Sequence, residues 1–103
     1  MTSKEYLAVL LPKMQGMDVT HRAMMGGYLI YYNSKYIACV CGDKFLIKDT
    51  PSAERLLPDA PLEYPYEGSR TLMRVIPGDI DSISLLELFE AVHPELPEPK
   101  KKK

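Results

Sequence analysis

The segment from residue 19 to residue 48 constrains the fold most, because apolar runs alternate there with turn residues. Three runs have the composition of β-strands: residues 23–32, 36–41 and 44–48. Asn-Ser-Lys at 33–35 and Gly-Asp at 42–43 are short enough to close hairpins. The Gly-Gly pair at 26–27 interrupts the first run and predicts a bulge or a close approach of another backbone. We therefore predict a meander of three antiparallel strands.

Helical segments are predicted on both sides of this meander. Thr2 and Glu5 form a capping-box pattern ahead of an apolar repeat at helical spacing, and Pro12 predicts a kink or an early end. A short helix is predicted after Thr50, where Pro follows in the first turn. A last helix carries an apolar face over 85–92. Ser84 and Glu87 form a second capping-box pattern at its start, and Asp81 or Ser82 is the alternative cap, one turn earlier.

The order of these elements defines the expected fold class. Residues 62–66 predict at best an edge strand, because they contain proline, and residues 71–76 predict a better strand. Antiparallel strands flanked by helices give an α+β two-layer sandwich, with four to five strands and the helices packed on one face. We expect one domain over residues 1–93 and a disordered tail of Pro, Glu and Lys over 94–103.

Composition argues against several classes of function. The chain has 103 residues and a net charge of −1, and four of its 13 basic residues form the run 100–103. Direct binding to duplex nucleic acid usually requires a positive excess, which is missing here. No apolar stretch is long enough to span a membrane, and no signal peptide is evident. Cys39 and Cys41 are spaced poorly for a disulfide, so we expect free thiols and a cytoplasmic location.

A short motif at the start of the meander resembles a known family. Arg22, Met24, Gly26, Gly27 and Tyr28 match the Arg-x-Met-Phe-Gly-Gly entry and Tyr-rich strand of the N-terminal domain of TfoX/Sxy competence regulators. Met25 stands where Phe is usual, and residues 45–48 resemble the family's Leu-Tyr-Leu-Lys strand. The resemblance covers roughly residues 3 to 92, with several short matches in the right order.

The resemblance implies a bacterial, non-enzymatic domain that regulates transcription of DNA-uptake genes through a protein partner. In the family that partner is a transcription regulator of the cyclic-AMP receptor type, and a second copy of the chain is an alternative. We expect no cofactor, no metal and no membrane. The residues expected to carry the interaction are Arg22, Met24, Met25, Gly26, Gly27, Tyr28 and Tyr31.

Three other sites are weighed against plain packing. Arg22 beside the two glycines is a candidate anion site, although no Gly-rich strand-to-helix loop is present. Cys39 and Cys41 with His21 and His93 are candidate zinc ligands, but Cys-x-Cys on a strand favours packing.

The six tyrosines between residues 28 and 66, with the lysine tail, form a candidate platform for single-stranded nucleic acid. A pocket between sheet and helices near Gly26-Gly27 would make the protein a small-molecule binder. The acidic balance argues against nucleic-acid binding and favours core and cross-strand packing of the tyrosine rings. If some of the rings are exposed, a protein interface is favoured over RNA, and Met24, Met25 and Met73 suit such a surface.

Overall fold

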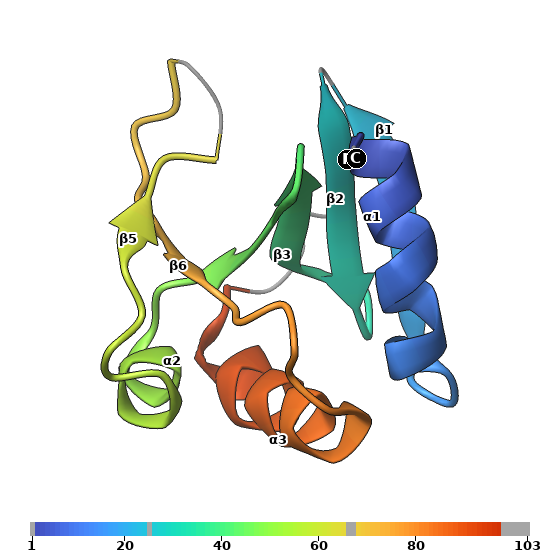
Figure 1. The fold of residues 1–103 in the computed structure, drawn as a ribbon. Coiled ribbons are helices and arrows are strands. Elements are labelled where there is room, and N and C mark those ends of the chain that lie inside the picture. Colours follow the sequence, from blue (N-terminus) through green and yellow to red (C-terminus); the bar gives the residue numbers. More distant parts are fainter. Residues whose placement is uncertain (1, 25, 66–67, 98–103) are drawn as a thin grey trace, which may run out of the picture.

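The computed structural model describes residues 2–24, 26–65 and 68–97, which form one sheet with helices (Figure 1). The helical elements are α1 (Ser3–Leu10), η1 (Leu11–Met14), α2 (Pro51–Leu56), α3 (Ser82–Val92) and η2 (His93–Glu95). The strands are β1 (Val19–Met24), β2 (Gly27–Tyr32), β3 (Lys35–Cys41), β4 (Lys44–Lys48), β5 (Leu62–Glu63) and β6 (Met73–Val75). The α+β class is confirmed.

The sheet is antiparallel throughout and has the strand order β1-β2-β3-β4-β6-β5. Its six strands exceed the predicted four to five. The additional strand arises because the run 23–32, predicted as one strand, is two strands of a hairpin. Gly26 has a φ of 73°, which L side chains rarely adopt, so it permits the chain to reverse. Gly27 opens β2, and a Cβ there would lie 2.2 Å from the Val40 carbonyl oxygen. The predicted close backbone approach is thus confirmed at Gly27.

The second hairpin contains an irregularity that decides which side chains share a face. Asn33 and Ser34 both have positive φ values, 48° and 73°, as a two-residue hairpin turn requires. The register then shifts between β2 and β3, so that Ile30 opposes Ala38 whereas Tyr31 opposes Tyr36. Ile37 is the extra residue of this bulge, and its side chain is fully buried in the main core.

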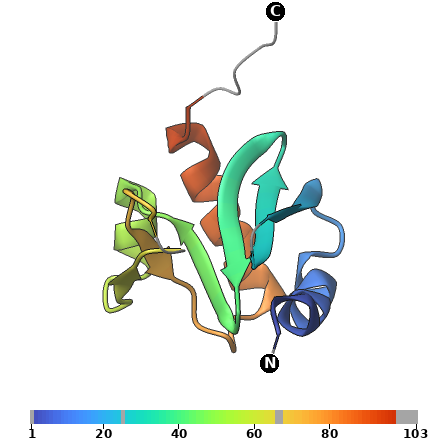
Figure 2. The same cartoon turned by 90° about the horizontal axis from the view of Figure 1, so that it is seen from above.

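The main core lies between the helices and one face of the sheet, here called the helix face. Ile30, Val40 and Phe45 of the sheet are fully buried there, together with Leu10 of α1 and Phe89 of α3. Figures 1 and 2 show these helices on the same side of the twisted sheet. Burial of apolar area at about 25 cal/mol per Å² makes this layer the dominant favourable term in folding.

Local sequence signals define the helix ends, although α3 begins one turn before the Ser84 capping box that we predicted, at the alternative cap Asp81. Thr2 accepts a hydrogen bond from the Glu5 amide, and the Glu5 carboxylate accepts one from the Thr2 amide. Thr50 caps α2, and Asp81 caps α3 by accepting from the Ser84 amide at 2.7 Å. α1 ends before Pro12, and the chain continues as the 3₁₀ turn η1.

The expectation that disorder begins at residue 94 is wrong for the first part of the tail. η2 includes Pro94 and Glu95, and the Leu96 side chain is buried in the main core. The Glu95 carboxylate accepts hydrogen bonds from the Ser52 amide and hydroxyl, at 3.0 and 2.7 Å. Lys35 donates to the carbonyl oxygens of His93 and Leu96. These contacts are long-range, so composition did not reveal them. Residues 98–103 lie outside the described part of the chain.

One buried cation joins the sheet to the loop after α2. The Arg74 side chain of β6 is 5% exposed and donates to Asp49 at 3.0 Å and to the carbonyl oxygens of Leu57 and Ala60. The guanidinium group thereby binds a carboxylate and two carbonyl oxygens of the loop that follows α2. Arg74 is therefore a structural residue.

Candidate interaction surface

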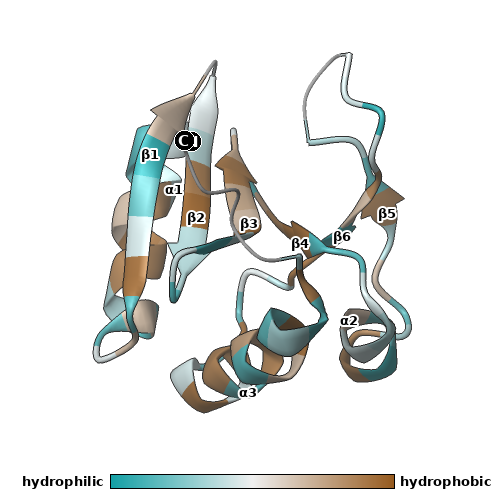
Figure 3. Ribbon diagram, turned by 180° about the vertical axis from the view of Figure 1, so that it is seen from behind, coloured by the Kyte–Doolittle hydropathy of each residue, from teal (hydrophilic) through white to brown (hydrophobic). Residues whose placement is uncertain are grey.

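Strand β1 forms one free edge of the sheet. Its four central side chains are exposed, and only Val19 and Met24 are partly buried. Figure 3 shows polar residues along the middle of β1 beside the apolar middle of β2. Natural proteins usually protect a sheet edge with Lys, Pro, a bulge or a short strand. β1 is six residues long, contains no Lys, Pro or bulge, and carries one charged side chain, Arg22.

The backbone of β1 presents free donors to solvent. The Asn33 amide donates to the Asp18 carbonyl at 3.0 Å, in line with the β1–β2 register. Because hydrogen bonds alternate in antiparallel pairs, the amides of His21 and Ala23 point away from β2. These two amides are available to an additional strand.

The opposite edge of the sheet is protected. β5 contains only two residues, and Pro61 and Pro65 flank it closely. Glu63 of β5 also forms an ion pair with Lys44 of β4. The two edges thus differ, and β1 is the one suited to strand addition.

The structure distributes the residues predicted to carry the interaction over both faces of the sheet. Arg22 and Met24 project from β1 toward the face opposite the helices, because they oppose Leu29 and Gly27 in the register. Tyr31 is on this same face, here called the open face, whereas Tyr28 lies on the helix face with its ring 5.8 Å from His21. Gly26 and Gly27 shape the turn, and Met25 lies outside the described residues.

Gly26 of the β1–β2 turn makes a contact within the protein. The Gly26 carbonyl accepts from the Ser3 hydroxyl at 2.7 Å, and the same hydroxyl accepts from the Gly42 amide at 2.6 Å. Ser3 therefore ties the start of α1 to two turns of the sheet. The glycine pair has a structural explanation that needs no ligand.

The open face carries a second, smaller cluster of side chains. Cys39, Leu46 and Met73 are buried in it, and Leu29, Tyr36, Cys41 and Val75 pack around them. The rings of Tyr31 and Tyr36 lie 5.9 Å apart, and the Lys48 ammonium lies 4.5 Å from the centre of the Tyr36 ring. This cation–π geometry leaves the charge near the surface.

Beside this cluster the open face is hollowed toward the β5–β6 loop. The hollow has a volume of about 330 Å³ and is lined by Tyr36, Lys48, Arg70 and Met73, with loop residues Pro65, Gly68, Ser69 and Thr71. Sequence reasoning named Met73 as suited to an interaction surface but did not identify Arg70 as a site residue. The position of Arg70 depends on the long connection between β5 and β6, which carries no periodic signal.

The predicted tyrosine platform is divided by the sheet. Tyr28 and Tyr32 lie on the helix face, where the Tyr32 ring contacts Phe89 at 5.6 Å, whereas Tyr31 and Tyr36 lie on the open face. Tyr64 is 56% exposed, and Tyr66 lies outside the described residues. Two adjacent rings are a smaller stacking surface than the six tyrosines that the sequence offered.

The two cysteines lie on the open face in contact with a methionine. The Cys41 thiol donates to Cys39 Sγ at 3.8 Å, and the Cys39 thiol donates to Met73 Sδ at 3.7 Å. Burial, followed by the neighbouring Cys41 thiol, raises the pKa of Cys39 to about 12. Burial also raises the pKa of Cys41. Neither thiol is therefore an activated nucleophile at neutral pH.

The zinc hypothesis required His21 and His93 to join the cysteines. Both histidines contact tyrosines of the helix face instead, His21 at Tyr28 and His93 at Tyr32. Among the described residues, no group of three or more His, Cys, Asp or Glu side chains is placed to hold a metal ion. The sheet separates the two kinds of ligand.

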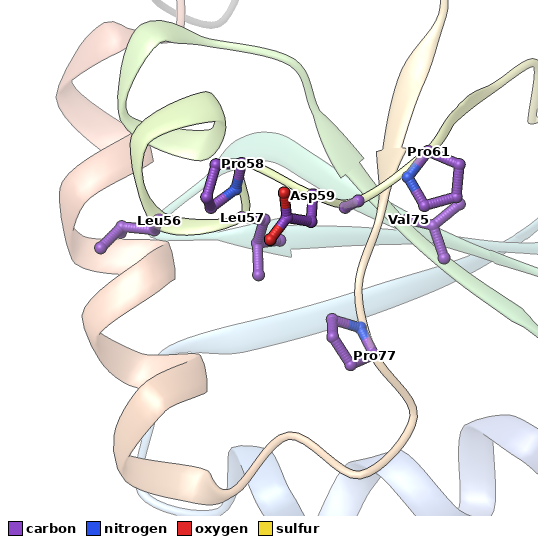
Figure 4. A pocket seen from close by; sticks show the side chains of 8 residues that line it. Leu56, Leu57, Pro58, Asp59, Pro61, Val75 and Pro77 are labelled. Atoms are coloured by element: carbon purple, nitrogen blue, oxygen red, sulfur yellow. The ribbon is translucent and has the colours of Figure 1, made fainter.

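A separate hollow of about 410 Å³ lies between the end of α2 and β6 (Figure 4). Its lining is mostly apolar: Leu56, Leu57, Pro58, Ala60, Pro61, Val75 and Pro77, with Asp59 at its side. It does not adjoin Gly26-Gly27, where a small-molecule pocket was expected. A single carboxylate and three prolines provide few polar groups to orient a ligand.

Comparisons with protein-family models, with curated proteins and with solved structures each found no match to this chain. The likeness to the TfoX/Sxy N-terminal domain consequently stays a prediction from the motif residues. Within the described ranges, no helix combines the length and the apolar character that crossing a membrane requires.

Proposed function

We propose that this chain is a regulatory protein-interaction domain, similar to the N-terminal domain of TfoX/Sxy competence regulators. Its partner, a protein that acts on transcription, adds an extended segment to the β1 edge. The observation that supports this proposal is the unprotected six-residue edge, which contrasts with the short and proline-flanked β5 edge. No catalytic step is part of the proposal.

The composition of β1 specifies the chemistry of the partner segment. Arg22 is its only permanent charge and, like Thr20 and Met24, projects toward the open face. A segment paired with β1 therefore needs a carboxylate opposite Arg22 and an apolar side chain near Met24. β1 itself carries no carboxylate, so the partner segment is expected to supply the one opposite Arg22.

Replacing Ala23 with proline is expected to block strand addition without disturbing the fold. The Ala23 amide points away from β2, so Ala23→Pro removes an outward donor and leaves the β1–β2 hydrogen bonds in place. Ala23→Thr is the matched control, since it changes the side chain at the same position and keeps the amide. Arg22→Glu tests the charge and should weaken binding of an acidic segment by about tenfold or more.

The experiment is affinity capture by each variant from nuclease-treated lysate of the encoding organism, read by mass spectrometry. The proposal expects a protein that wild type and Ala23→Thr retain and that Ala23→Pro and Arg22→Glu lose. Equal retention by Ala23→Pro would refute an edge interaction. If a partner is captured from untreated lysate but not from nuclease-treated lysate, nucleic-acid contact is the function instead. Light scattering that shows a dimer broken by Ala23→Pro would identify a second copy as the occupant.

A further inference from the structure

The sulfur atoms on the open face form a continuous group contributed by two strands that are distant in sequence. Cys39 and Cys41 belong to β3, and Met73 belongs to β6 on the other side of β4. Sγ of Cys39 is 3.8 Å from Sγ of Cys41 and 3.7 Å from Sδ of Met73. The chain contains only these two cysteines, and both are free thiols in this group.

We propose that Cys39, Cys41 and Met73 bind a soft monovalent metal ion of the Cu(I) class. Thiolate and thioether sulfur are the ligands that such an ion prefers. A metal at the centre of three sulfur atoms, at metal–sulfur distances of about 2.3 Å, requires sulfur atoms about 4 Å apart. The two contacts through Cys39 are already within a few tenths of an ångström of that spacing.

The surroundings of the sulfur group fit a metal complex better than they fit a reactive thiol. Binding converts the two thiols to thiolates and releases two protons to solvent, so the Cu(I) complex carries a net charge of −1. The Lys48 ammonium, which lies over the Tyr36 ring, is the nearby cation that offsets this charge. The hydroxyl of Tyr36 donates to Met73 Sδ at 3.8 Å and orients the thioether.

The sulfur group is buried at Cys39 and Met73, and no described helix residue belongs to its cluster, so an ion reaches it from the open face. Met73 and Tyr36 line the 330 Å³ hollow, and Cys41 is half-buried at the other end of the group. Harder ions are disfavoured, since the described residues place no third Cys, His or carboxylate at the site. The site therefore selects Cu(I) over Zn²⁺ by ligand type.

The test is an anaerobic titration of the full reduced chain with Cu(I), in competition with the colorimetric chelator bicinchoninate. Wild type should bind one Cu(I) per chain, and Cys39→Ser and Cys41→Ser should each lower the affinity about 100-fold. Met73→Leu should lower it about tenfold. Met14→Leu is the matched control, because Met14 is equally buried but lies in the main core.

X-ray absorption at the copper edge gives a second measurement that does not depend on affinity. Three sulfur ligands are expected in wild type and two in Met73→Leu, whereas Met14→Leu should retain three. Circular dichroism checks that each variant folds. If Cys39→Ser does not fold, the comparison of Met73→Leu with Met14→Leu still tests the site. The proposal is overturned if Met73→Leu matches wild type in affinity and sulfur count, or if Zn²⁺ binds as tightly as Cu(I).

Discussion

Replacement of Gly27 by alanine tests the close approach of β2 and β3. The new Cβ would lie 2.2 Å from the Val40 carbonyl oxygen and 3.3 Å from its carbonyl carbon. Carbon–oxygen contacts between strands settle at about 3.3–3.6 Å, so the two backbones would have to part by about 1 Å. The obstacle is backbone and not a flexible side chain, so relaxation requires the loss of sheet hydrogen bonds.

The expected loss of stability in Gly27→Ala has two contributions. Overpacking of a tight site costs about 1–3 kcal/mol, and each weakened backbone hydrogen bond adds about 0.5–1.5 kcal/mol. We expect Gly27→Ala to lower the free energy of unfolding by about 3–4 kcal/mol. Gly26→Ala is the control next to it in sequence. Its Cβ meets nothing within 4 Å, so only the positive φ opposes it, at a cost of about 1 kcal/mol.

Urea unfolding of the two variants, followed by circular dichroism, measures both free energies. A difference of about 2–3 kcal/mol corresponds to a Tm gap of at least about 8 °C in a domain of this size. If Gly27→Ala were no more destabilising than Gly26→Ala, the close approach of β2 to β3 would be refuted. The m-values should agree between the two variants, because both unfold the same domain.

Three further perturbations probe the fold and the thiols. Arg74→Ala should cost about 2–4 kcal/mol in urea unfolding, because it removes the hydrogen bonds that join β6 to Asp49 and to the carbonyls of Leu57 and Ala60; a loss under 1 kcal/mol would contradict that role. Hydrogen bonds from Thr50 and then Ser52 lower the pKa of Glu95 in the folded chain. The stability that the ionised Glu95 carboxylate adds to the fold is therefore present above the unfolded pKa and is lost as pH falls through the folded pKa. Glu95→Gln should accordingly be less stable than wild type at pH 7 and equal to it near pH 2. A difference in stability that persists near pH 2 would show that ionisation of Glu95 is not its cause. In native alkylation at pH 8 Cys41 should react before Cys39, whose pKa is raised to about 12, and mass spectrometry showing the reverse order would contradict the burial of Cys39.

Signals contained within a few residues determined much of this fold. The Thr2 capping box, the Pro12 break and the Thr50 cap were read correctly, because each depends on groups within one helical turn. The strands after residue 33 were also predicted well, since their turns contain the residues that positive φ or tight reversal requires. The α+β class followed from the order of these local elements.

Local sequence signals could not predict the β1–β2 hairpin or the ordered start of the tail. Apolar residues lie on both sides of Gly26, so periodicity alone did not separate a bulge from a reversal of the chain. Leu96 is buried because Lys35 and Ser52, distant in sequence, hold the segment that precedes it. Pairing over such distances depends on the whole sheet and not on composition.

Tertiary structure alone decided which side chains form the candidate sites. The bulge at Ile37 brings Tyr36 and Cys39 to the same face, although their spacing of three places them on opposite faces of a regular strand. Met73 joins the cysteines only because β6 pairs with β4. The free β1 edge is likewise a property of strand order. A sequence specifies which strands form, whereas the packing of all strands decides which edge and which face remain open to a partner.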